Sequence, residues 1–347
     1  MPALPRRRVL TGVCLLAAVL LAACSSSSGS GPSSSSPPLA PSGSAVSPGV
    51  TPDISGLSPV IVYRDTLAAA IIAQTPDKSR SFKLNLSGLA SGETVLDLDC
   101  APDGSRSAYI VVQGQPFTNR VVISVDGQAR SVPFSESIRG VSWSPDGRRL
   151  AVALSAFGGT NPRIVLVDPA TGGTTDLPAG QGRPGIPQWS PDGTRLVFDA
   201  PLGKVNQLST LKIGDPAPDQ ITHRDQGAFS PDWSPDGQTI VFATTEPDGL
   251  AEVYAVSPDG SNERPLTNSG VSKGVPRYSP DGKQLAFVGT VSVPVTSAAP
   301  VLMHNLGIFM AAADGSGEQM FTDLAKDAWL LTWCSAGAWL QHDWEQQ

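Results

Sequence analysis

Five acidic turns are the part of this sequence whose residue types and spacing could do chemistry. Four of them read Ser-Pro-Asp-Gly and one reads Ala-Pro-Asp-Gly, and their aspartates are Asp103, Asp146, Asp192, Asp236 and Asp281. Carboxylate oxygens bind hard metal ions when several of them converge on one point. The alternative is that the turn recurs because a structural unit recurs, so that each aspartate serves its own turn.

The spacing of the turns favours the structural alternative. Successive aspartates are 43, 46, 44 and 45 residues apart, a period typical of four-stranded propeller blades. In such a turn proline presets φ, aspartate bonds back to the backbone, and glycine adopts the left-handed conformation. Because equivalent turns of a propeller lie around a ring, we do not expect the five aspartates to share a metal.

Composition and the repeats together predict an all-β, six-bladed β-propeller with four-stranded blades. The 35 Gly and 32 Pro among 347 residues favour frequent turns over long helices. The aromatic residues before the turns are expected to wedge between neighbouring blades: Trp143, Trp189, Trp233 and Tyr278. The sixth unit has Trp333 but no turn aspartate. We expect two strands from residues 68–86 to complete its blade, so that both ends of the chain close the ring.

The amino terminus has the features of an export signal. Three arginines precede an apolar stretch from Val9 to Cys24, which is shorter than the roughly 20 residues that span a membrane. Its end, "LAAC", is similar to a bacterial lipobox, whose cysteine receives a diacylglycerol and becomes the first residue; an ordinary secretory signal is the alternative. We predict a lipoprotein signal peptide over 1–23, lipidation of Cys24, a Ser/Pro/Gly-rich tether over 24–57, and the propeller over 58–347.

The charge of the chain limits the classes of partner. Its formal net charge is −7, and loss of residues 1–23 would leave 21 basic and 31 acidic residues, a net charge of −10. An acidic surface repels phosphate backbones and anionic lipid headgroups. We therefore expect no nucleic acid partner and attachment to the membrane through the lipid alone.

At this point the repeats support a family resemblance. The W-S-P-D-G turns, each followed by a strand like the "LAF" of Leu285 to Phe287, resemble the carboxy-terminal six-bladed propeller of TolB and its relatives. The resemblance covers roughly residues 58–347 and implies the fold. The small α/β domain that precedes the propeller in TolB is replaced here by the serine-rich segment, and propellers of this class serve as scaffolds, sensors and substrate-gating domains.

Residues with the spacing of a catalytic site are hard to find. A propeller-bearing serine peptidase would need an additional hydrolase domain, for which the chain leaves no room. His223, His304 and His342 share no metal-ligand spacing. The predicted channel-lining strands offer three carboxylates, Asp97, Asp99 and Asp232, which leaves a channel-site metal-dependent lactonase- or lyase-like enzyme as the alternative function. No cofactor is predicted.

Two cysteines remain after the signal and the lipidation site are set aside. Cys100 occupies the aromatic position of the first repeat, and Cys334 lies one residue past that position in the last. Because the first and last blades are neighbours in a closed ring, an exported protein could join them by a disulfide. Two buried free thiols are the alternative, since equivalent strands can lie too far apart for the bond.

A partner is expected at the face that carries the loops entering each inner strand. Those loops hold basic residues in an otherwise acidic protein: Arg139, Arg183, Arg224, Lys273 and Lys326. Beside them, residues 290–305 form the longest predicted loop, apolar and free of lysine, arginine and acids. The sequence therefore predicts a monomeric, non-enzymatic binding or assembly module, lipid-anchored on the outside of the cell membrane or in the outer membrane, with an envelope protein or extracellular ligand as partner.

Overall fold

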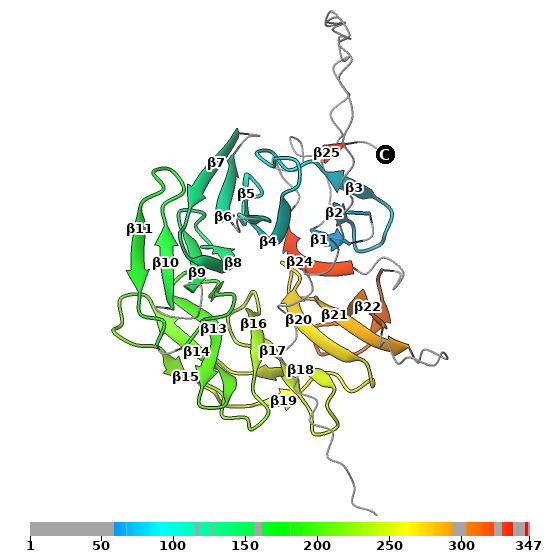
Figure 1. The fold of residues 1–347 in the computed structure, drawn as a ribbon. Helices are drawn as coiled ribbons and strands as arrows, with labels where there is room; N and C mark the ends of the chain where they lie inside the picture. Colours follow the sequence, from blue (N-terminus) through cyan, green and yellow to red (C-terminus); the bar gives the residue numbers. More distant parts are fainter. Residues whose placement is uncertain are drawn as a thin grey trace, which may run out of the picture. The chain divides into compact units, whose positions relative to one another are not determined.

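The structure is a computed structural model, and the ring that it describes is a six-bladed β-propeller (Figure 1). It describes residues 59–66, 68–114, 118–125, 128–155, 162–180, 182–293, 303–322, 328–335 and 344–345. All regular elements in these ranges are strands, as the sequence predicts. None of the described residues forms a helix long and apolar enough to cross a membrane.

Each blade is an antiparallel sheet whose first strand lies nearest the ring centre (Figure 1). Blade 1 contains β4 (Thr94–Cys100), β5 (Arg106–Gln113), β6 (Thr118–Val125) and β7 (Gln128–Pro133). Blade 2 contains β8 (Ser137–Trp143), β9 (Leu150–Ser155), β10 (Arg163–Val167) and β11 (Thr174–Leu177). Blade 3 contains β12 (Gln188–Trp189), β13 (Arg195–Leu202), β14 (Val205–Lys212) and β15 (Asp219–Gln220).

The remaining blades complete the ring in chain order. Blade 4 contains β16 (Phe229–Trp233), β17 (Ile240–Thr245), β18 (Ala251–Val256) and β19 (Arg264–Pro265). Blade 5 contains β20 (Ser272–Tyr278), β21 (Gln284–Val293), β22 (Met303–Ala312) and β23 (Gln319–Met320). Blade 6 contains β24 (Ala328–Cys334), β1 (Val60–Asp65), β2 (Ala70–Gln74), β3 (Ser81–Leu84) and β25 (Trp344–Glu345).

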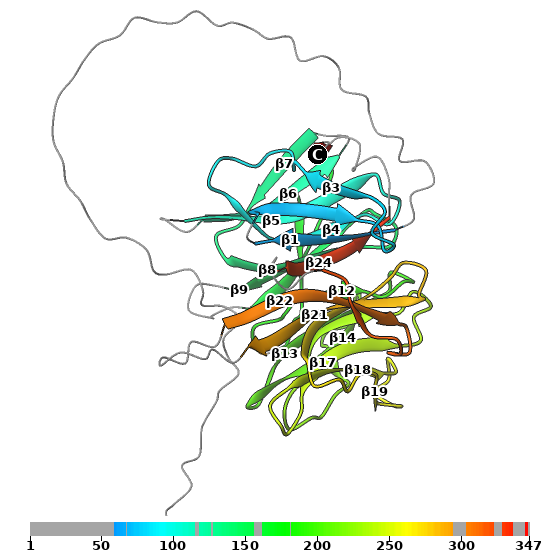
Figure 2. The ribbon, with the colours of Figure 1, turned by 90° about the vertical axis from the view of Figure 1, so that its right-hand side faces the viewer.

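Blade 6 confirms that strands from both ends of the chain close the ring. The order of its strands is β24, β1, β2, β3 and β25, and Figure 2 shows β24 beside β1. The amino-terminal segment contributes three strands where the sequence predicts two, because β1 (Val60–Asp65) pairs directly with β24. The carboxyl-terminal segment supplies the inner strand and the two-residue β25 at the outer edge.

The acidic turns have the geometry that their sequence predicts. In the blade 2 turn, Gly147 has a φ of 64°, which is the left-handed conformation that favours glycine. The Ser144 hydroxyl donates to the Asp146 carboxylate at 2.6 Å, and the Arg148 backbone N–H donates to the same oxygen at 3.0 Å. Equivalent pairs hold the turns of blades 3, 4 and 5. These hydrogen bonds lower the pKa of the turn aspartates, which therefore stabilise turns.

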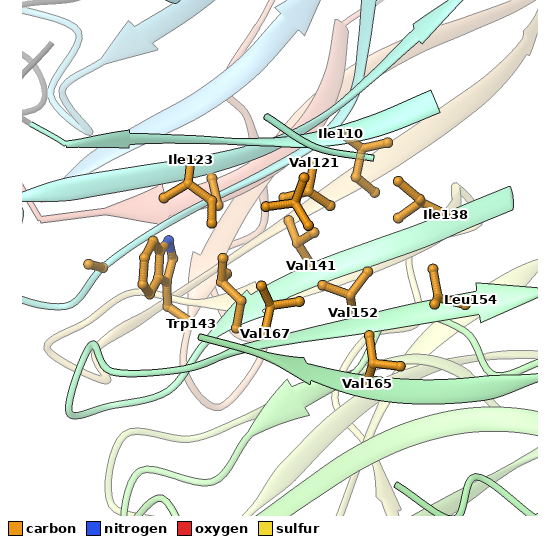
Figure 3. Close-up of a cluster of buried hydrophobic side chains, with 14 of the residues drawn as sticks. Ile110, Val121, Ile123, Ile138, Val141, Trp143, Val152, Leu154, Val165 and Val167 are labelled. Carbon is orange, nitrogen blue, oxygen red and sulfur yellow. The ribbon is translucent and has the colours of Figure 1, made fainter. Parts of the chain in front are cut away.

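The hydrophobic core is divided into clusters that lie between neighbouring blades. Figure 3 shows one of them, which contains Trp143, Val152 and Val165 of blade 2 together with Ile110 and Ile123 of blade 1. Trp143 is 3% exposed. Trp189, Trp233, Tyr278 and Trp333 pack in the same way against the preceding blade. The predicted role of the aromatic residues as wedges is therefore confirmed.

Candidate functional site

The centre of the ring is lined by polar side chains from the inner strands. They occupy one equivalent position per blade, directly before the aromatic or cysteine residue: Asp99, Ser142, Gln188, Asp232, Arg277 and Thr332. Contacts link neighbours around this polar ring: the Thr332 hydroxyl donates to Asp99 at 3.2 Å, and the Ser142 hydroxyl donates to Gln188 at 3.4 Å. Asp97 lies two residues before Asp99 on β4 and is 7% exposed.

The three carboxylates of this region join one blade to the next. Asp97 accepts a hydrogen bond from the Val141 backbone N–H at 3.0 Å, and Asp99 accepts one from the Trp143 backbone N–H at 2.7 Å. Asp232 accepts one from the Tyr278 backbone N–H at 2.8 Å. The inner edge of a blade has no further strand to pair with, so its backbone donors need side-chain acceptors. These aspartates supply them.

Burial makes the same carboxylates unusually basic. It raises the pKa of Asp97 to about 7, while the hydrogen bond from Val141 and the charge of Arg277 oppose the shift. Burial likewise raises the pKa of Asp99 and of Asp232 to about 6. Repulsion between Asp99 and its acidic neighbours adds to the shifts at Asp97 and Asp232. The acidic cluster therefore takes up protons near neutral pH.

Arg277 is the positive charge of the polar ring. It is 5% exposed, and its Nη1 donates to the carbonyl oxygens of Pro276 at 3.0 Å and Pro231 at 3.4 Å. Its charge lowers the pKa of all three aspartates, although less than burial raises it. Among the residues that the structure describes, no group of three histidine, cysteine or acidic side chains is placed to hold a metal ion.

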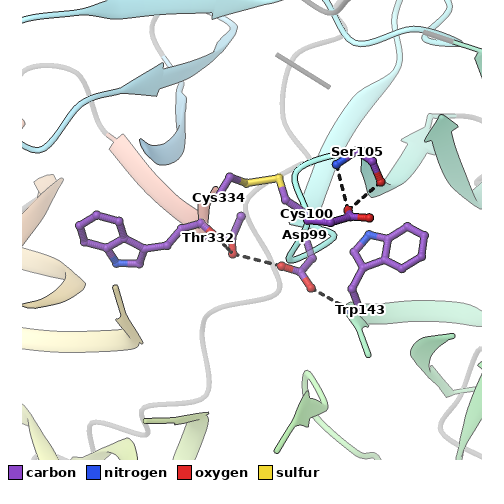
Figure 4. The surroundings of a disulfide bond; sticks show 8 residues. Asp99, Cys100, Ser105, Trp143, Thr332 and Cys334 are labelled. Carbon is purple, nitrogen blue, oxygen red and sulfur yellow. Dashed lines mark hydrogen bonds between the residues drawn. A yellow bond between two sulfur atoms is a disulfide. The ribbon is translucent and has the colours of Figure 1, made fainter. Parts of the chain in front are cut away.

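A disulfide lies beside the polar ring, at the seam between blades 6 and 1. It links Cys100 of β4 to Cys334 of β24, with 5.5 Å between the two Cα atoms. This is the pairing that the sequence suggests. Figure 4 shows Asp99 next to the bond, with its carboxylate reaching Trp143 in blade 2 and Thr332 in blade 6. Asp99 thus connects three consecutive blades.

The predicted basic rim is only partly present. Arg139 and Arg183 are exposed, and the charge of Arg139 acts on the buried Asp199, whose pKa is raised by burial. Arg224 is half-buried and forms ion pairs with Glu246 at 3.1 Å and Glu263 at 2.5 Å.

The buried position of Lys273 contradicts the predicted basic rim most clearly. Its side chain is 0% exposed, and its Nζ lies 2.8 Å from Glu252 and 3.6 Å from Glu318. A buried lysine needs such partners, so Lys273 is not part of an exposed rim. Lys326 lies outside the described residues.

The apolar loop predicted over residues 290–305 is shorter than expected. β21 and β22 each run for ten residues, and their pairing extends to Val293 and Met303. β-branched residues such as Val291 and Val293 favour the extended backbone, which explains why the strands continue here. Residues 294–302 lie outside the described part, as does the predicted lipidation site Cys24.

One serine motif escapes the sequence analysis. The letters G-x-S-x-G occur once, from Gly270 to Gly274, with Ser272 at their centre. Ser272 is the first residue of β20, and its hydroxyl oxygen accepts a hydrogen bond from the Ala251 backbone N–H at 3.1 Å. In hydrolases the serine of this motif stands in a turn from a strand to a helix. This serine stands on a strand, so the motif here is not a nucleophile elbow.

The class of the protein follows from the fold and the polar ring: it is a six-bladed propeller whose blades repeat a Ser-Pro-Asp-Gly turn. Residues 103–296 match the model of the TolB beta propeller domain family. The match covers more than half of the chain, and the chain therefore belongs to the TolB β-propeller family.

Individual relatives are similar to this chain over part of their length. An uncharacterized peptidase, YuxL of Bacillus subtilis (strain 168), is 26% identical over 224 residues, which are 60% of this chain and 31% of that protein. A TolB homolog of Chlorobium luteolum is 37% identical over 103 residues, 29% of this chain and 23% of that protein. The matched segment therefore spans less than a third of either relative.

Among solved structures, TolB from Acinetobacter baumannii superposes with a TM-score of 0.59 at 17% sequence identity. The superposition covers 80% of this chain and 66% of that structure. At this level of identity the likeness concerns the fold alone.

Proposed function

We propose that this chain is a lipid-anchored, extracytoplasmic binding or assembly module of the cell envelope without catalytic activity. The supporting observation is the use of the central carboxylates: Asp97, Asp99 and Asp232 each accept a backbone N–H from the next blade. A propeller enzyme would use central side chains of this kind as reactive groups. In this chain they join neighbouring blades. Membership of the TolB family agrees with a scaffold role.

The proposed anchor is Cys24, after removal of residues 1–23, and the proposed tether is residues 24–57. A flexible coil of this length would span about 30 Å, which would let a monomeric propeller reach a partner beyond the membrane surface. Lipid attachment would place the protein on the outside of the cell membrane or in the outer membrane. The partner would be an envelope protein or an extracellular ligand.

The anchor is tested with the full chain and its Cys24→Ser variant, expressed in a bacterium. We expect the wild type in the membrane fraction, with a diacylglycerol and an added fatty acid such as palmitate on its first peptide by mass spectrometry. The variant should leave the membrane fraction and remain outside the cytoplasm. A variant that stays with the membrane as firmly as the wild type would contradict the lipid anchor.

The docking surface proposed for the partner contains the exposed Arg139 and Arg183. The charge-reversal pair Arg139→Glu and Arg183→Glu should reduce crosslinking to envelope components at an unchanged melting temperature. The matched control reverses two exposed charges on the turns, Arg148→Glu and Lys283→Glu, and should not reduce it. If both double variants crosslink equally well, Arg139 and Arg183 do not belong to the binding surface.

A second candidate is a channel-site metal-dependent enzyme, favoured by the three carboxylates that lie near Arg277. Metal analysis of the purified chain separates the two functions. A stoichiometric divalent ion that is lost in an Asp97→Asn, Asp99→Asn variant would support the enzyme, whereas a metal-free wild type that still binds its partner would support the binding module.

A further inference from the structure

Arg277 is a buried cation of the polar ring that uses only part of its guanidinium. The residue is 5% exposed, and it forms no ion pair with any carboxylate that the structure describes. Its hydrogen bonds all come from Nη1, which donates to the carbonyl oxygens of Pro231 at 3.4 Å and Pro276 at 3.0 Å. A buried charge is costly unless it is paired and hydrogen-bonded, so the rest of the guanidinium is free to bind a ligand.

The unused part of Arg277 is the edge formed by Nε and Nη2. Neither nitrogen has a hydrogen-bond acceptor among the described residues, and neither is sealed from solvent, in contrast to the buried Nε atoms of Arg163 and Arg224. Nε and Nη2 carry parallel N–H groups, which is the geometry that binds both oxygens of one carboxylate. This edge of Arg277 therefore fits the carboxylate of a ligand.

The guanidinium of Arg277 lies toward the centre of the ring. It belongs to blade 5, yet its charge acts on Asp97 and Asp99 of blade 1 and on Asp232 of blade 4. Blades 1 and 4 lie on opposite sides of the ring (Figure 1), so a charge that reaches both must act across its centre. Solvent reaches the polar ring, because Asp99, Gln188 and Asp232 are only partly buried.

The aspartates of the polar ring limit which carboxylate ligand can bind. Three acidic side chains share this region with one guanidinium, and they would repel an anion that carries no compensating charge. Asp232 accepts the Tyr278 backbone N–H at Oδ2, and its Oδ1 can accept a hydrogen bond from a cation. Both oxygens of Asp99 already have partners, Trp143 and Thr332. A ligand with an ammonium group next to its carboxylate would match both Arg277 and Asp232.

We propose that the centre of the polar ring binds a free α-amino acid. The α-carboxylate would bind Nε and Nη2 of Arg277, and the α-ammonium would donate to Oδ1 of Asp232. The contact of Nη1 with the carbonyl of Pro231 holds the guanidinium beside Asp232, which is the next residue. The inference goes beyond the proposed binding function and does not depend on it, because the docking surface uses Arg139 and Arg183 instead.

The probe for the test is glycine, the smallest α-amino acid, titrated into the purified intact chain. The Nε–H signal of Arg277, assigned with Arg277→Lys, should shift with a dissociation constant on the order of 1 mM, as expected for so small a ligand. Acetate and methylammonium each carry one of the two charges and should bind at least about tenfold more weakly. Acetate that binds as tightly as glycine would overturn the proposal, as would the absence of any shift at about 50 mM glycine.

Conservative variants, compared by calorimetric titration with glycine, locate the site. Arg277→Lys keeps the positive charge but removes the paired N–H groups, and should weaken binding by about tenfold or more. Asp232→Asn keeps an oxygen for the Tyr278 N–H and loses the negative charge, and should weaken it by about fivefold or more. The matched control, Arg139→Lys, changes an exposed arginine of another inner strand and should leave binding unchanged.

The melting temperature of each variant shows whether it is folded. If folded Arg277→Lys binds glycine as tightly as the wild type, or if Arg139→Lys weakens binding as much, the polar ring is not the site. If Arg277→Lys does not fold, the comparison of glycine with acetate and methylammonium on the wild type still decides. Loss of envelope crosslinking with intact glycine binding would count against the proposed function alone.

Discussion

The junction between blades 1 and 2 and the seam between blades 6 and 1 solve the same packing problem differently. At the first junction Trp143 fills the space between the blades and Arg106 covers its ring. At the seam the equivalent position holds Cys100, which is bonded to Cys334. The side chains around this pair, including Val62 and Tyr109, form a core cluster without a tryptophan.

The difference reflects how the chain connects the blades. Blades 1 and 2 are consecutive in the chain, so a wedge needs only to fix their packing. The inner strands of blades 6 and 1 belong to opposite ends of the propeller sequence, and the backbone links them through the pairing of β24 with β1 instead of a short connection. A covalent bond at the position of the wedge restricts the unfolded chain as well as stabilising the contact. Junctions closed only by packing should therefore respond differently to mutation than the seam.

The largest effect is expected from breaking the seam. Replacing Cys100 and Cys334 by alanine should lower the free energy of unfolding by about 4 kcal/mol, because the bond closes a very long loop. Denaturant unfolding of the wild type and the variant, followed by tryptophan fluorescence, measures it. Reduction of the wild type should reproduce the loss. Two alkylatable thiols in the unreduced wild type would instead show that the bond does not form.

The next largest loss of stability is expected at Asp99, whose carboxylate contacts both the seam and the junction between blades 1 and 2. Asp99→Ala should cost about 2–3 kcal/mol, because it leaves the buried Trp143 N–H without its acceptor and removes the hydrogen bond from Thr332. Asp99→Asn keeps one acceptor oxygen and should cost less. Thermal unfolding of the two variants compares them. If both lose the same stability, the hydrogen bonds of Asp99 do not join the blades.

A smaller effect is expected from pH. The pKa of Asp97 is raised to about 7 in the folded protein, above its value of about 3.9 in an unfolded chain. The folded state therefore holds more protons between about pH 4 and 7, and its stability falls as pH rises through this window. Asp97→Asn should raise the melting temperature at pH 8, with a gain of about 1–2 kcal/mol, and change it little at pH 4. A gain independent of pH would contradict the raised pKa.

The smallest effect concerns the arginine that covers the first junction. Arg106→Met keeps the apolar length of the side chain and removes the charge, so it should cost about 0.5–1 kcal/mol through the lost contact with Trp143. The matched variant Arg148→Met removes an exposed arginine from the neighbouring turn and should be neutral. Urea unfolding curves of the two variants decide whether the contact with the ring contributes.

The repeats allowed the fold and the wedges to be predicted because each depends on local rules. Turn chemistry fixes the hairpins, and a period near 45 residues fixes the blade, so the positions of Trp143 and Asp146 follow from sequence alone. The role of Asp97 and Asp99 in joining the blades could not be predicted from the sequence. Their partners are backbone N–H groups of another blade, and a backbone donor has no signature in the sequence.

The basic rim was less predictable because charge alone does not report exposure. Lys273 lies in a loop-like stretch, yet Glu252 of blade 4 and Glu318 of blade 5 both form ion pairs with it. The polar ring could have been found by aligning the six residues that precede the aromatic positions, which places Arg277 and Thr332 beside Asp99.

The pairing of β24 with β1 also determines when the ring can close during synthesis of the chain. A chain that leaves the ribosome, or crosses a membrane, from its amino terminus presents β1, β2 and β3 long before β24 exists. Until then β1 exposes an unpaired edge, which is the kind of surface that recruits wrong strands. The pairing of β1 with β24 has the longest sequence separation in the ring, and such contacts form slowly. The last inner strand to be synthesised thus pairs with the blade that was begun first, and the edge of β1 stays exposed throughout that interval.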